Sequence, residues 1–255
     1  MWEHAADASL AGSIYFRPAN VYGAGRAMLD LNRLTSEVTA LNTAWPRVAL
    51  LYSQPSIFWE PKYQGTIYSL YTVLNFMGEN VTFVSERQLA EGTAAKVQWL
   101  IVPNATHVLS WTPAALVALA KKGGQILLVG KESLGRDEYD RPLNRADYPA
   151  MELAGDEPAT AAALRQALAP LPFNDLHDVA TGKPAWGVEF RVVQPGRATL
   201  VALNNFNKEA KTVTLPRWAK EPALDLLSGE RVDLRAVSVE PMVPRLLRTG
   251  GKLPD

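Results

Sequence analysis

The run Val48-Ala49-Leu50-Leu51-Tyr52 is the first of four short apolar segments that decide the fold of this chain. The other three are Val81–Val84, Trp99–Val102 and Gln125–Val129. Continuous apolar runs of this length are typical of strands buried on both faces of a parallel sheet. Helical patterns separate them, which indicates βαβ units. The predicted fold class is therefore α/β, with a flavodoxin-like, doubly wound parallel sheet.

The segments between these strands carry helix signals. A helix is expected from about Lys62 to Met77, because its apolar residues recur on one face. Ser85 and Gln88 form a capping-box pattern for a short helix after the second strand. Thr112 and Pro113 fit the N-cap and first helical positions of a further helix. These signals place residues 48–170 in one α/β domain.

The remainder of the chain changes period. Residues 131–157 read as a polar loop, a short helix is expected at about 158–168, and prolines and a glycine mark 171–185 as a linker. From Trp186 the apolar period becomes two, which predicts a small antiparallel β-sandwich over 186–255. Its expected strands are Val188–Val193, Ala198–Asn204, Lys211–Leu215, Ala223–Leu227, Arg231–Leu234 and Arg245–Leu247.

The opening segment, residues 1–47, looks like an incomplete unit. Ser13–Phe16 could form one strand, Pro18 and two glycines suggest a loop, and a helix is expected from about Arg26 to Leu41. The apolar stripe of that helix consists of Ala27, Leu31, Leu34, Val38 and Leu41. One strand cannot cover it, so we expect the stripe to pack against the parallel-sheet domain or a neighbouring subunit.

Charge and composition exclude several classes of protein. The chain has 26 basic and 26 acidic residues, which argues against a nucleic-acid or membrane partner. It has no Cys, so disulfides and a Cys nucleophile are excluded. No signal peptide or membrane span is visible at the start or elsewhere, so a cytoplasmic location is expected. A net charge of zero also suits self-association.

The order of the three parts carries a resemblance to a known family. The stretch Val48–Asp140 resembles the β-galactosidase trimerisation domain of family 42 glycoside hydrolases, a relative of class I glutamine amidotransferase domains. The matching pieces are Val48–Ser53, the helix before Gly78, Trp99–Pro103, Leu116 to Gly124, Gln125–Gly130 and Gly135–Tyr139. Asp225–Gly229 and the ending Pro241–Leu247 resemble the C-terminal β-sandwich of such enzymes, and Tyr15-Phe16-Arg17 with the following helix is similar to the eighth strand and helix of their TIM barrel.

This resemblance implies that the first seven barrel strands, which hold the acid/base and nucleophile glutamates in the family, are missing. Retaining glycosidases need two carboxyl groups roughly 5 Å apart. Glu3 lies where a barrel strand would end, but it has no identifiable partner. The leading hypothesis is a truncated glycoside-hydrolase-like protein without glycosidase activity of its own. It would act in homo-oligomerisation or by binding carbohydrate or a larger glycosidase partner. In another interpretation the chain is only the end of a longer enzyme.

The turn after the third strand reads Pro103-Asn104-Ala105-Thr106-His107. An amidotransferase-type domain would place a Cys there. His107 is a candidate base, but the sequence pairs no nucleophile with it. Ser110 and Ser133 read more simply as cap or turn residues. The three histidines are scattered, so a zinc site is not predicted.

The acidic loop Asp137-Glu138-Tyr139-Asp140 follows the end of the fourth strand, where doubly wound folds bind ligands. Asp137 and Glu138 join His107 as candidate catalytic residues. Asp137, Glu138 and Asp140 are also candidate calcium ligands, because Ca²⁺ takes carboxylate oxygens from flexible loops. Interleaved arginines make internal ion pairs the simpler account, and no other cofactor is predicted. The alternative function is a small hydrolase of an ester, lactone or glycoside that uses this loop, with Ca²⁺ as its candidate ion.

Aromatic residues cluster just after the first strand. Trp59 and Tyr63 are the candidate ligand contacts of this group, since their rings could stack on a sugar. Tyr68 and Tyr71 lie on or beside the apolar helical stripe, which favours packing instead.

Overall fold

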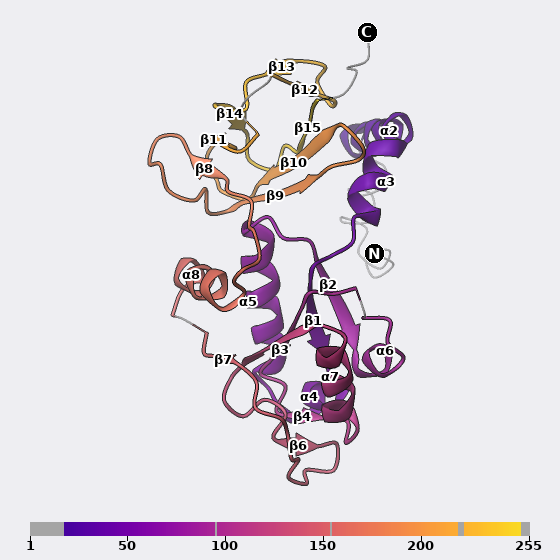
Figure 1. Ribbon diagram of the computed structural model, residues 1–255. Coiled ribbons are helices and arrows are strands. Elements are labelled where there is room, and N and C mark those ends of the chain that lie inside the picture. The colour runs from indigo at the N-terminus through magenta and orange to yellow at the C-terminus, as the bar shows by residue number, and fades with distance from the viewer. Residues whose placement is uncertain (1–17, 95, 154, 219–221, 251–255) are drawn as a thin grey trace.

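The computed structural model of the chain describes residues 18–94, 96–153, 155–218 and 222–250. Figure 1 shows an α/β domain below, a β-sandwich above it, and two opening helices beside the sandwich. The strand expected at 13–16 and the candidate Glu3 lie outside the described residues. No helix within the described ranges is long and apolar enough to cross a membrane.

The α/β domain is built on a parallel sheet. In the described part of the chain its strand order is β2-β1-β3-β5-β7, with every neighbouring pair parallel. The strands are β1 (Val48–Tyr52), β2 (Val81–Ser85), β3 (Trp99–Pro103), β5 (Gln125–Val129) and β7 (Ala150–Met151). This is the flavodoxin-like order, so the predicted fold class is confirmed. The sequence missed β7, because two residues are too short to show a period.

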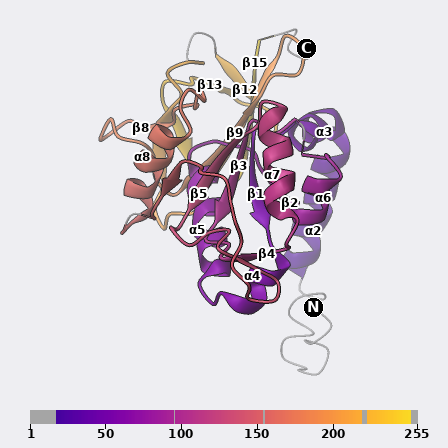
Figure 2. The same ribbon diagram turned by 60° about the horizontal axis from the view of Figure 1, so that its bottom comes forward.

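Helices cover both faces of this sheet, as Figure 2 shows. On one face lie α5 (Tyr63–Phe76) and α8 (Glu157–Ala167), and on the other lie α6 (Glu86–Ala90) and α7 (Thr112–Lys121). The short α4 (Gln54–Trp59) follows the carboxyl end of β1. Each face has its own apolar core, which explains why the strands read as continuous apolar runs.

The helix starts follow the sequence closely, with one shift. Ser85 and Gln88 form the predicted capping box of α6, with both reciprocal hydrogen bonds present. The prediction of Thr112 as an N-cap was wrong by one position. Trp111 is the N-cap, and the Thr112 hydroxyl donates instead to the carboxylate of Glu86 at 2.9 Å.

The C-terminal domain consists of two facing antiparallel sheets in the described residues, with orders β13-β12-β15-β10-β9 and β14-β11-β8. Their strands are β8 (His177–Asp178), β9 (Val188–Val193), β10 (Thr199–Asn205), β11 (Lys211–Thr214), β12 (Ala223–Asp225), β13 (Arg231–Val232), β14 (Val237–Val239) and β15 (Arg245–Thr249). Val188, Phe190 and Val201 of one sheet pack with Val213 and Val237 of the other. The predicted β-sandwich is confirmed.

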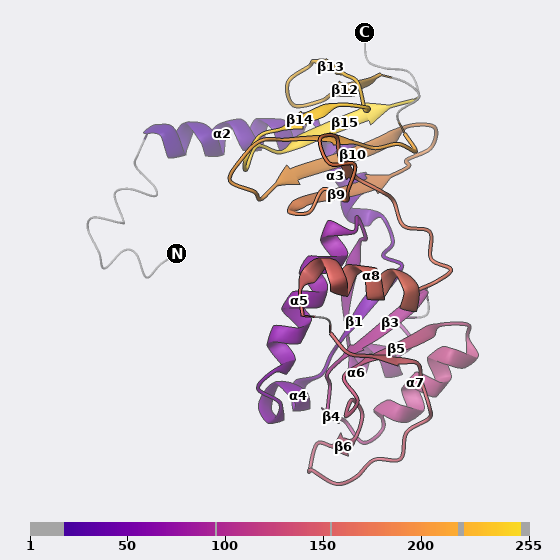
Figure 3. The same cartoon turned by 90° about the vertical axis from the view of Figure 1, so that its left-hand side faces the viewer.

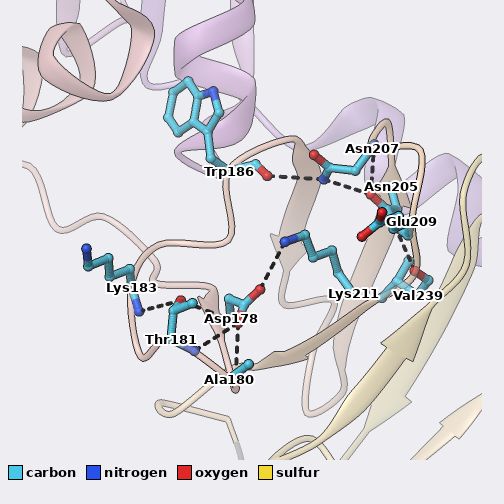
Figure 4. A network of polar contacts seen from close by, with 10 residues as sticks. All are labelled: Asp178, Ala180, Thr181, Lys183, Trp186, Asn205, Asn207, Glu209, Lys211 and Val239. Atoms are coloured by element: carbon cyan, nitrogen blue, oxygen red, sulfur yellow. Dashed lines mark hydrogen bonds and ion pairs between the residues drawn. The ribbon is translucent and has the colours of Figure 1, made fainter.

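The stretch predicted as a linker, 171–185, supplies β8 and two buried side chains, Leu176 and Ala185, to the sandwich. Figure 4 shows how β8 is held. The Asp178 carboxylate accepts from the backbone N–H groups of Ala180 and Thr181 and from Lys211 on β11. These contacts, the Thr181 backbone bond above all, lower the pKa of Asp178. The sandwich therefore begins within the segment that looked like a connector.

A second network in Figure 4 secures the turn after β10. Asn205 donates to the carbonyls of Glu209 and Val239, and its own Oδ1 accepts from the backbone and side-chain amides of Asn207. Asn207 also donates to the carbonyl of Trp186 at 3.1 Å. The turn is thus tied to the start of β9, close to the boundary with the α/β domain.

The opening helices depart from the prediction at both ends. Helix α2 spans Pro18–Arg33 and α3 spans Thr35–Thr43, with an interruption at Leu34. The expected loop over Pro18 and the glycines is helix instead, and Pro18 takes its first position, where its missing N–H costs nothing. Of the two partners expected for the stripe, the parallel-sheet domain was wrong, and a neighbouring subunit stays a prediction. Leu34 is buried on the outer face of the sandwich with Leu200 and Leu246.

Charged contacts support the same docking of α3. Arg248 on β15 pairs with Glu37 of α3 at 3.2 Å, and Arg33, the last residue of α2, donates to the carbonyl of Leu227 at 3.4 Å. By contrast, α2 has no buried residue, and Figure 3 shows it projecting along the outside of the sandwich. One helix is therefore part of the sandwich and its neighbour is only beside it.

Candidate functional site

The predicted site residues gather at the carboxyl edge of the parallel sheet. The chain turns to opposite sides of β1 at this edge, since β2 and β3 flank β1, and such switch points are where doubly wound folds bind ligands. Strand β4 (His107–Val108) pairs in parallel with β6 (Arg136–Asp137). That pairing brings the turn after β3 against the acidic loop. We call this region the carboxyl edge.

His107 lies at the centre of the carboxyl edge. Its Nε2 is 3.0 Å from Oδ1 of Asp140, and its Nδ1 is 3.0 Å from the hydroxyl of Thr106. The indole of Trp59 stacks on the imidazole, with ring centroids 5.0 Å apart and planes at 11°. Both ring nitrogens are therefore engaged inside the protein, and one ring face is covered.

Asp140 occupies the tip of the acidic loop in a left-handed backbone conformation with φ of 64°. Its hydrogen bond to His107, assisted by Arg136 at 3.1 Å, lowers the pKa of the Asp140 carboxyl. Half of this side chain remains exposed to solvent. The pair is thus an exposed ionised carboxylate that holds a nearly buried imidazole in place.

Asp137 and Glu138 point to other partners. Asp137 accepts from the backbone N–H groups of Tyr139 and Arg141, each within 2.9 Å, and so shapes the loop. Glu138 accepts from the backbone N–H of Ser110 at 2.7 Å and from its hydroxyl. Within the described ranges no three such side chains converge in a way that could hold a metal ion. Calcium binding by Asp137, Glu138 and Asp140 stays a prediction.

Sequence reasoning missed one carboxylate, Glu86. It is 3% exposed and accepts from the backbone N–H of Leu109 at 2.7 Å. Burial, and to a smaller degree the nearby charge of Glu138, raise the pKa of Glu86. The signal was its place directly after the capping residue Ser85 at a strand end. Glu86 accepts from Leu109 and Glu138 accepts from the following residue, Ser110, so the two carboxylates hold the same loop in place.

The turn after β3 is tight. Asn104 has φ of 48°, and a side chain at the neighbouring Gly130 would meet its Oδ1 at 2.5 Å. An amide cannot act as the nucleophile in place of a thiol or a hydroxyl. Asn104 therefore supplies no nucleophile at this turn.

The other candidates have structural roles. Tyr63, predicted as a ligand contact, has no exposed surface, and its hydroxyl donates to the carbonyl of Leu51 and accepts from the N–H of Ser53. Burial raises the pKa of this phenol. Ser133 donates to the carbonyl of Val129 at 2.7 Å. Trp59, at 50% exposure, is the candidate ring that still offers surface to a partner.

A second feature lies on the opening helices. A cavity of about 780 Å³ separates α2 from the sandwich, lined by Ala27, Leu31, Leu34 and Val38 on the helices and by Leu227 and Leu246 on the sandwich. On α2, Val21 and Met28 are seven residues apart, as are Tyr22 and Leu29, so each pair shares a helix face. All four are more than half exposed, Leu29 most of all at 69%. We call this cavity, with the exposed apolar side chains of α2, the α2 surface.

The fold is similar to that of solved glycosidase structures. The sequence matches no family model and no curated protein. Among solved structures, an apo exo-carrageenase GH42 from Bacteroides ovatus matches with a TM-score of 0.75 and 17% identity, over 92% of this chain and 33% of that one. A GH42 beta-galactosidase from G. stearothermophilus matches with a TM-score of 0.60 and 15% identity, over 81% of this chain and 40% of that one.

The chain has the fold of part of the GH42 glycosidases. A beta-galactosidase from Bacillus circulans sp. alkalophilus agrees, with a TM-score of 0.55 and 14% identity, over 80% of this chain and 41% of that one. This chain therefore spans about a third to two fifths of the length of the structures it matches. At such identities the likeness establishes the fold alone.

Proposed function

We propose that this chain is a non-catalytic assembly part of a GH42-like glycosidase, and that its α2 surface docks on a catalytic barrel. Two observations carry the proposal: the matched structures are much longer than this chain, and apolar side chains of α2 are exposed. The matched structures are more than twice as long as this chain, and α2 has a second apolar face on which no other described part of the chain packs. Because the opening segment resembles the last helix of a TIM barrel, we infer that the partner that covers the α2 surface is such a barrel.

Burial arithmetic supports a protein partner for this surface. Covering an apolar side chain is worth about 25 cal/mol per Å². Val21, Tyr22, Met28 and Leu29 lie on the same side of α2 at helical spacing. Monomeric proteins seldom leave such strips open, and large ones mark interaction sites. Self-association through the α/β domain, as the trimerisation-domain resemblance implies, is part of the same proposal.

The carboxylates of the described residues support a non-catalytic role. Glu86 and Glu138 are near each other, but Glu86 is enclosed and bonded to Leu109 and Thr112. Neither lines the cavity beside α2. A retaining pair needs both groups to face one sugar across an open site. We therefore expect the chain alone to show no turnover of nitrophenyl galactoside.

The test begins with the DNA that precedes the codon for Met1. We expect it, or an adjoining gene, to encode a barrel with two paired glutamates. That barrel, produced with this chain, should be recovered as a stable complex in which nitrophenyl galactoside turnover depends on the chain. Met28→Ser with Leu29→Ser should weaken the complex at least tenfold by analytical ultracentrifugation. Val179→Ser, at another exposed apolar residue, is the matched control and should leave it intact.

Two results would overturn the proposal. One is turnover of nitrophenyl galactoside by this chain alone. The other is a barrel whose stability and activity are the same with and without the chain.

The alternative hypothesis, a small hydrolase of an ester, lactone or glycoside, is supported by one observation. His107, Asp140 and the half-exposed Trp59 meet at the switch point of the sheet. An ester or lactone assay with and without Ca²⁺ tests it. Full activity after Asp137→Ala and Glu138→Ala would remove the version that uses the acidic loop.

A further inference from the structure

A smaller cavity lies where the two domains and the α3–β1 connection meet. Its volume is about 270 Å³. Pockets for drug-sized ligands measure roughly 300–1,000 Å³, so this one suits a single ring with its substituents. It is lined by Trp45 and Arg47 before β1, Glu79 after α5, Arg191 on β9, and Arg217 and Trp218 after β11. We call it the junction cavity.

The junction cavity has an excess of positive charge. Three arginines line it, and Glu79 is the one acidic residue among its lining residues in the described part of the chain. Arg47 is already committed, because it pairs with Glu79 and donates to the carbonyl of Pro172 at 3.2 Å. Burial raises the pKa of Glu79 despite that pair. The formal charge left to the cavity comes from Arg191 and Arg217.

These two arginines lack acidic partners in the described ranges. Arg191 makes no side-chain hydrogen bond or ion pair there, although β9 holds its backbone in register against Ala202. Arg217 lies over the ring of Trp218, 5.0 Å from its centroid, and has no ion pair within the same residues. Arginine forks match the oxygens of carboxylate, sulfate and phosphate groups.

Trp218, which lines the same cavity, carries an unsatisfied donor. The indole Nε1 of Trp218 is buried and has no hydrogen-bond acceptor in the described part of the protein. Buried N–H groups without a partner are uncommon, and each calls for an explanation such as a missing ligand or water. Two guanidinium groups without acidic partners in the described residues therefore border the cavity, whereas the indole N–H of Trp218 is buried where this residue packs against the sandwich core.

The aromatic lining selects the kind of molecule that carries the anion. Trp45 is half exposed, and Trp218 offers an indole from the opposite domain. Indole rings present a broad apolar face with a polar edge, which suits the apolar face of a sugar ring. Inorganic anions gain nothing from such a face, whereas a ring that bears an anion uses both features.

We propose that the junction cavity binds an anionic monosaccharide unit, a pyranose carrying a carboxylate or a sulfate. Arg191 and Arg217 hold the anionic group, and Trp218, which also lines the cavity, contacts the ring of the ligand. The site lies apart from the carboxyl edge, and Arg191 is the one residue among its described lining that also lines the cavity beside α2, so the site does not depend on the proposed assembly role. Both domains contribute to it, and the ligand consequently stabilises their junction.

Isothermal titration calorimetry on the full chain tests the proposal with four probes: glucuronate, galactose 6-sulfate, galactose and sodium sulfate. Saturable binding is expected for at least one of the two anionic sugars, at least tenfold tighter than for galactose or sulfate. Raising the salt concentration should weaken it by screening. Glucuronate and galactose 6-sulfate distinguish a carboxylate from a sulfate source of the anion.

Variants then assign the contacts. Arg191→Gln should weaken binding about tenfold or more, and Trp218→Phe should weaken it while keeping an aromatic ring. Arg231→Gln is the matched control, because Arg231 is an exposed arginine on β13 of the same sandwich, outside the cavity. Thermal unfolding of each variant confirms that it folds.

Three outcomes would overturn the proposal. They are no saturable binding of either anionic sugar, equal binding of galactose or of sulfate alone, and equal loss of binding in Arg231→Gln and Arg191→Gln. A cross-check on folded protein is the quenching of Trp fluorescence by the anionic sugar, which should be reduced in Trp218→Phe.

Discussion

The carboxyl edge and the junction cavity are both rich in polar groups, but they differ in how those groups are satisfied. At the carboxyl edge, His107, Asp137, Glu138 and Asp140 each have partners within the protein. In the junction cavity, Arg191 and the Nε1 of Trp218 have none in the described part of the chain. A polar group with an internal partner contributes to stability, whereas an accessible guanidinium without a partner, such as that of Arg191, is available to a ligand.

The largest effect on stability is expected at the buried ion pair Arg47–Glu79, which lines the junction cavity but is satisfied within the protein. Arg47→Met leaves the Glu79 carboxylate buried without its cation, and we expect the free energy of unfolding at pH 7 to fall by about 3 kcal/mol. The pKa of Glu79 is already raised, so stability falls as pH rises above the ordinary value for Glu. The loss should therefore be smaller near pH 4, where Glu79 is protonated.

The control for this change is the double variant Arg47→Met with Glu79→Leu, which removes both charges and should recover most of the loss at pH 7. Urea unfolding of the wild type and of both variants at pH 4 and pH 7 measures these losses in the free energy of unfolding. Equal destabilisation at pH 4 and pH 7 would show that lost packing, rather than an unpaired charge, is responsible.

The next effect concerns the carboxyl edge. His107→Ala removes the stack on Trp59 and the hydrogen bonds to Thr106 and Asp140. We expect a loss of about 2 kcal/mol in the free energy of unfolding. His177→Ala is the control, since the His177 ring makes no such contacts in the described residues, and it should cost less than half as much. A neutral His107→Ala would mean that the edge is not braced in this way.

The effect of pH on the carboxyl edge follows from Asp140. Its pKa is lowered in the folded state, so its contribution is present above the ordinary Asp value and is lost as pH falls through the lowered value. Wild type should be more stable than Asp140→Asn at pH 6, and the difference should shrink below about pH 4. Asp147→Asn, at an exposed residue of the same loop, is the control and should show no such trend.

The smallest effect is expected in the junction cavity itself. Arg191→Gln should change the free energy of unfolding by no more than about 0.5 kcal/mol, because its guanidinium has no partner to lose. Measured together with sugar binding, it separates stability from recognition. If Arg191→Gln lowered the free energy of unfolding as much as Arg47→Met does, Arg191 would have a structural partner, and the two regions would not differ in how their polar groups are satisfied.

Much of the architecture could be predicted because it depends on local pattern. The four apolar runs and the capping box at Ser85 specified the parallel sheet and one helix start, and period-two patterning specified the sandwich. The two-residue strands β7 and β8 escaped, since their pairing comes from neighbours and not from their own residues. The opening helices were misplaced because Pro18 and Gly23 are equally compatible with a loop and with an exposed helix.

The candidate sites divide in the same way. The sequence pointed to His107, Asp140 and Trp59 because they follow strand ends, and the structure brings these three together. It placed Tyr63 with them, although the ring points into the core, and it could not reveal the part played by Glu86. The junction cavity was invisible, because its lining comes from five separate segments of the chain.

By itself the sequence determined the succession of buried strands, the change to period two at the sandwich and the absence of a thiol at the turn after β3. These features depend on residue type and on spacing over a few positions. Tertiary structure alone decided that α3 packs on the sandwich rather than on the parallel sheet, that the acidic loop folds back onto His107, and that unpaired arginines border one cavity. Such outcomes depend on which segments, far apart in the sequence, pack against each other, and the local pattern of residues does not specify those contacts.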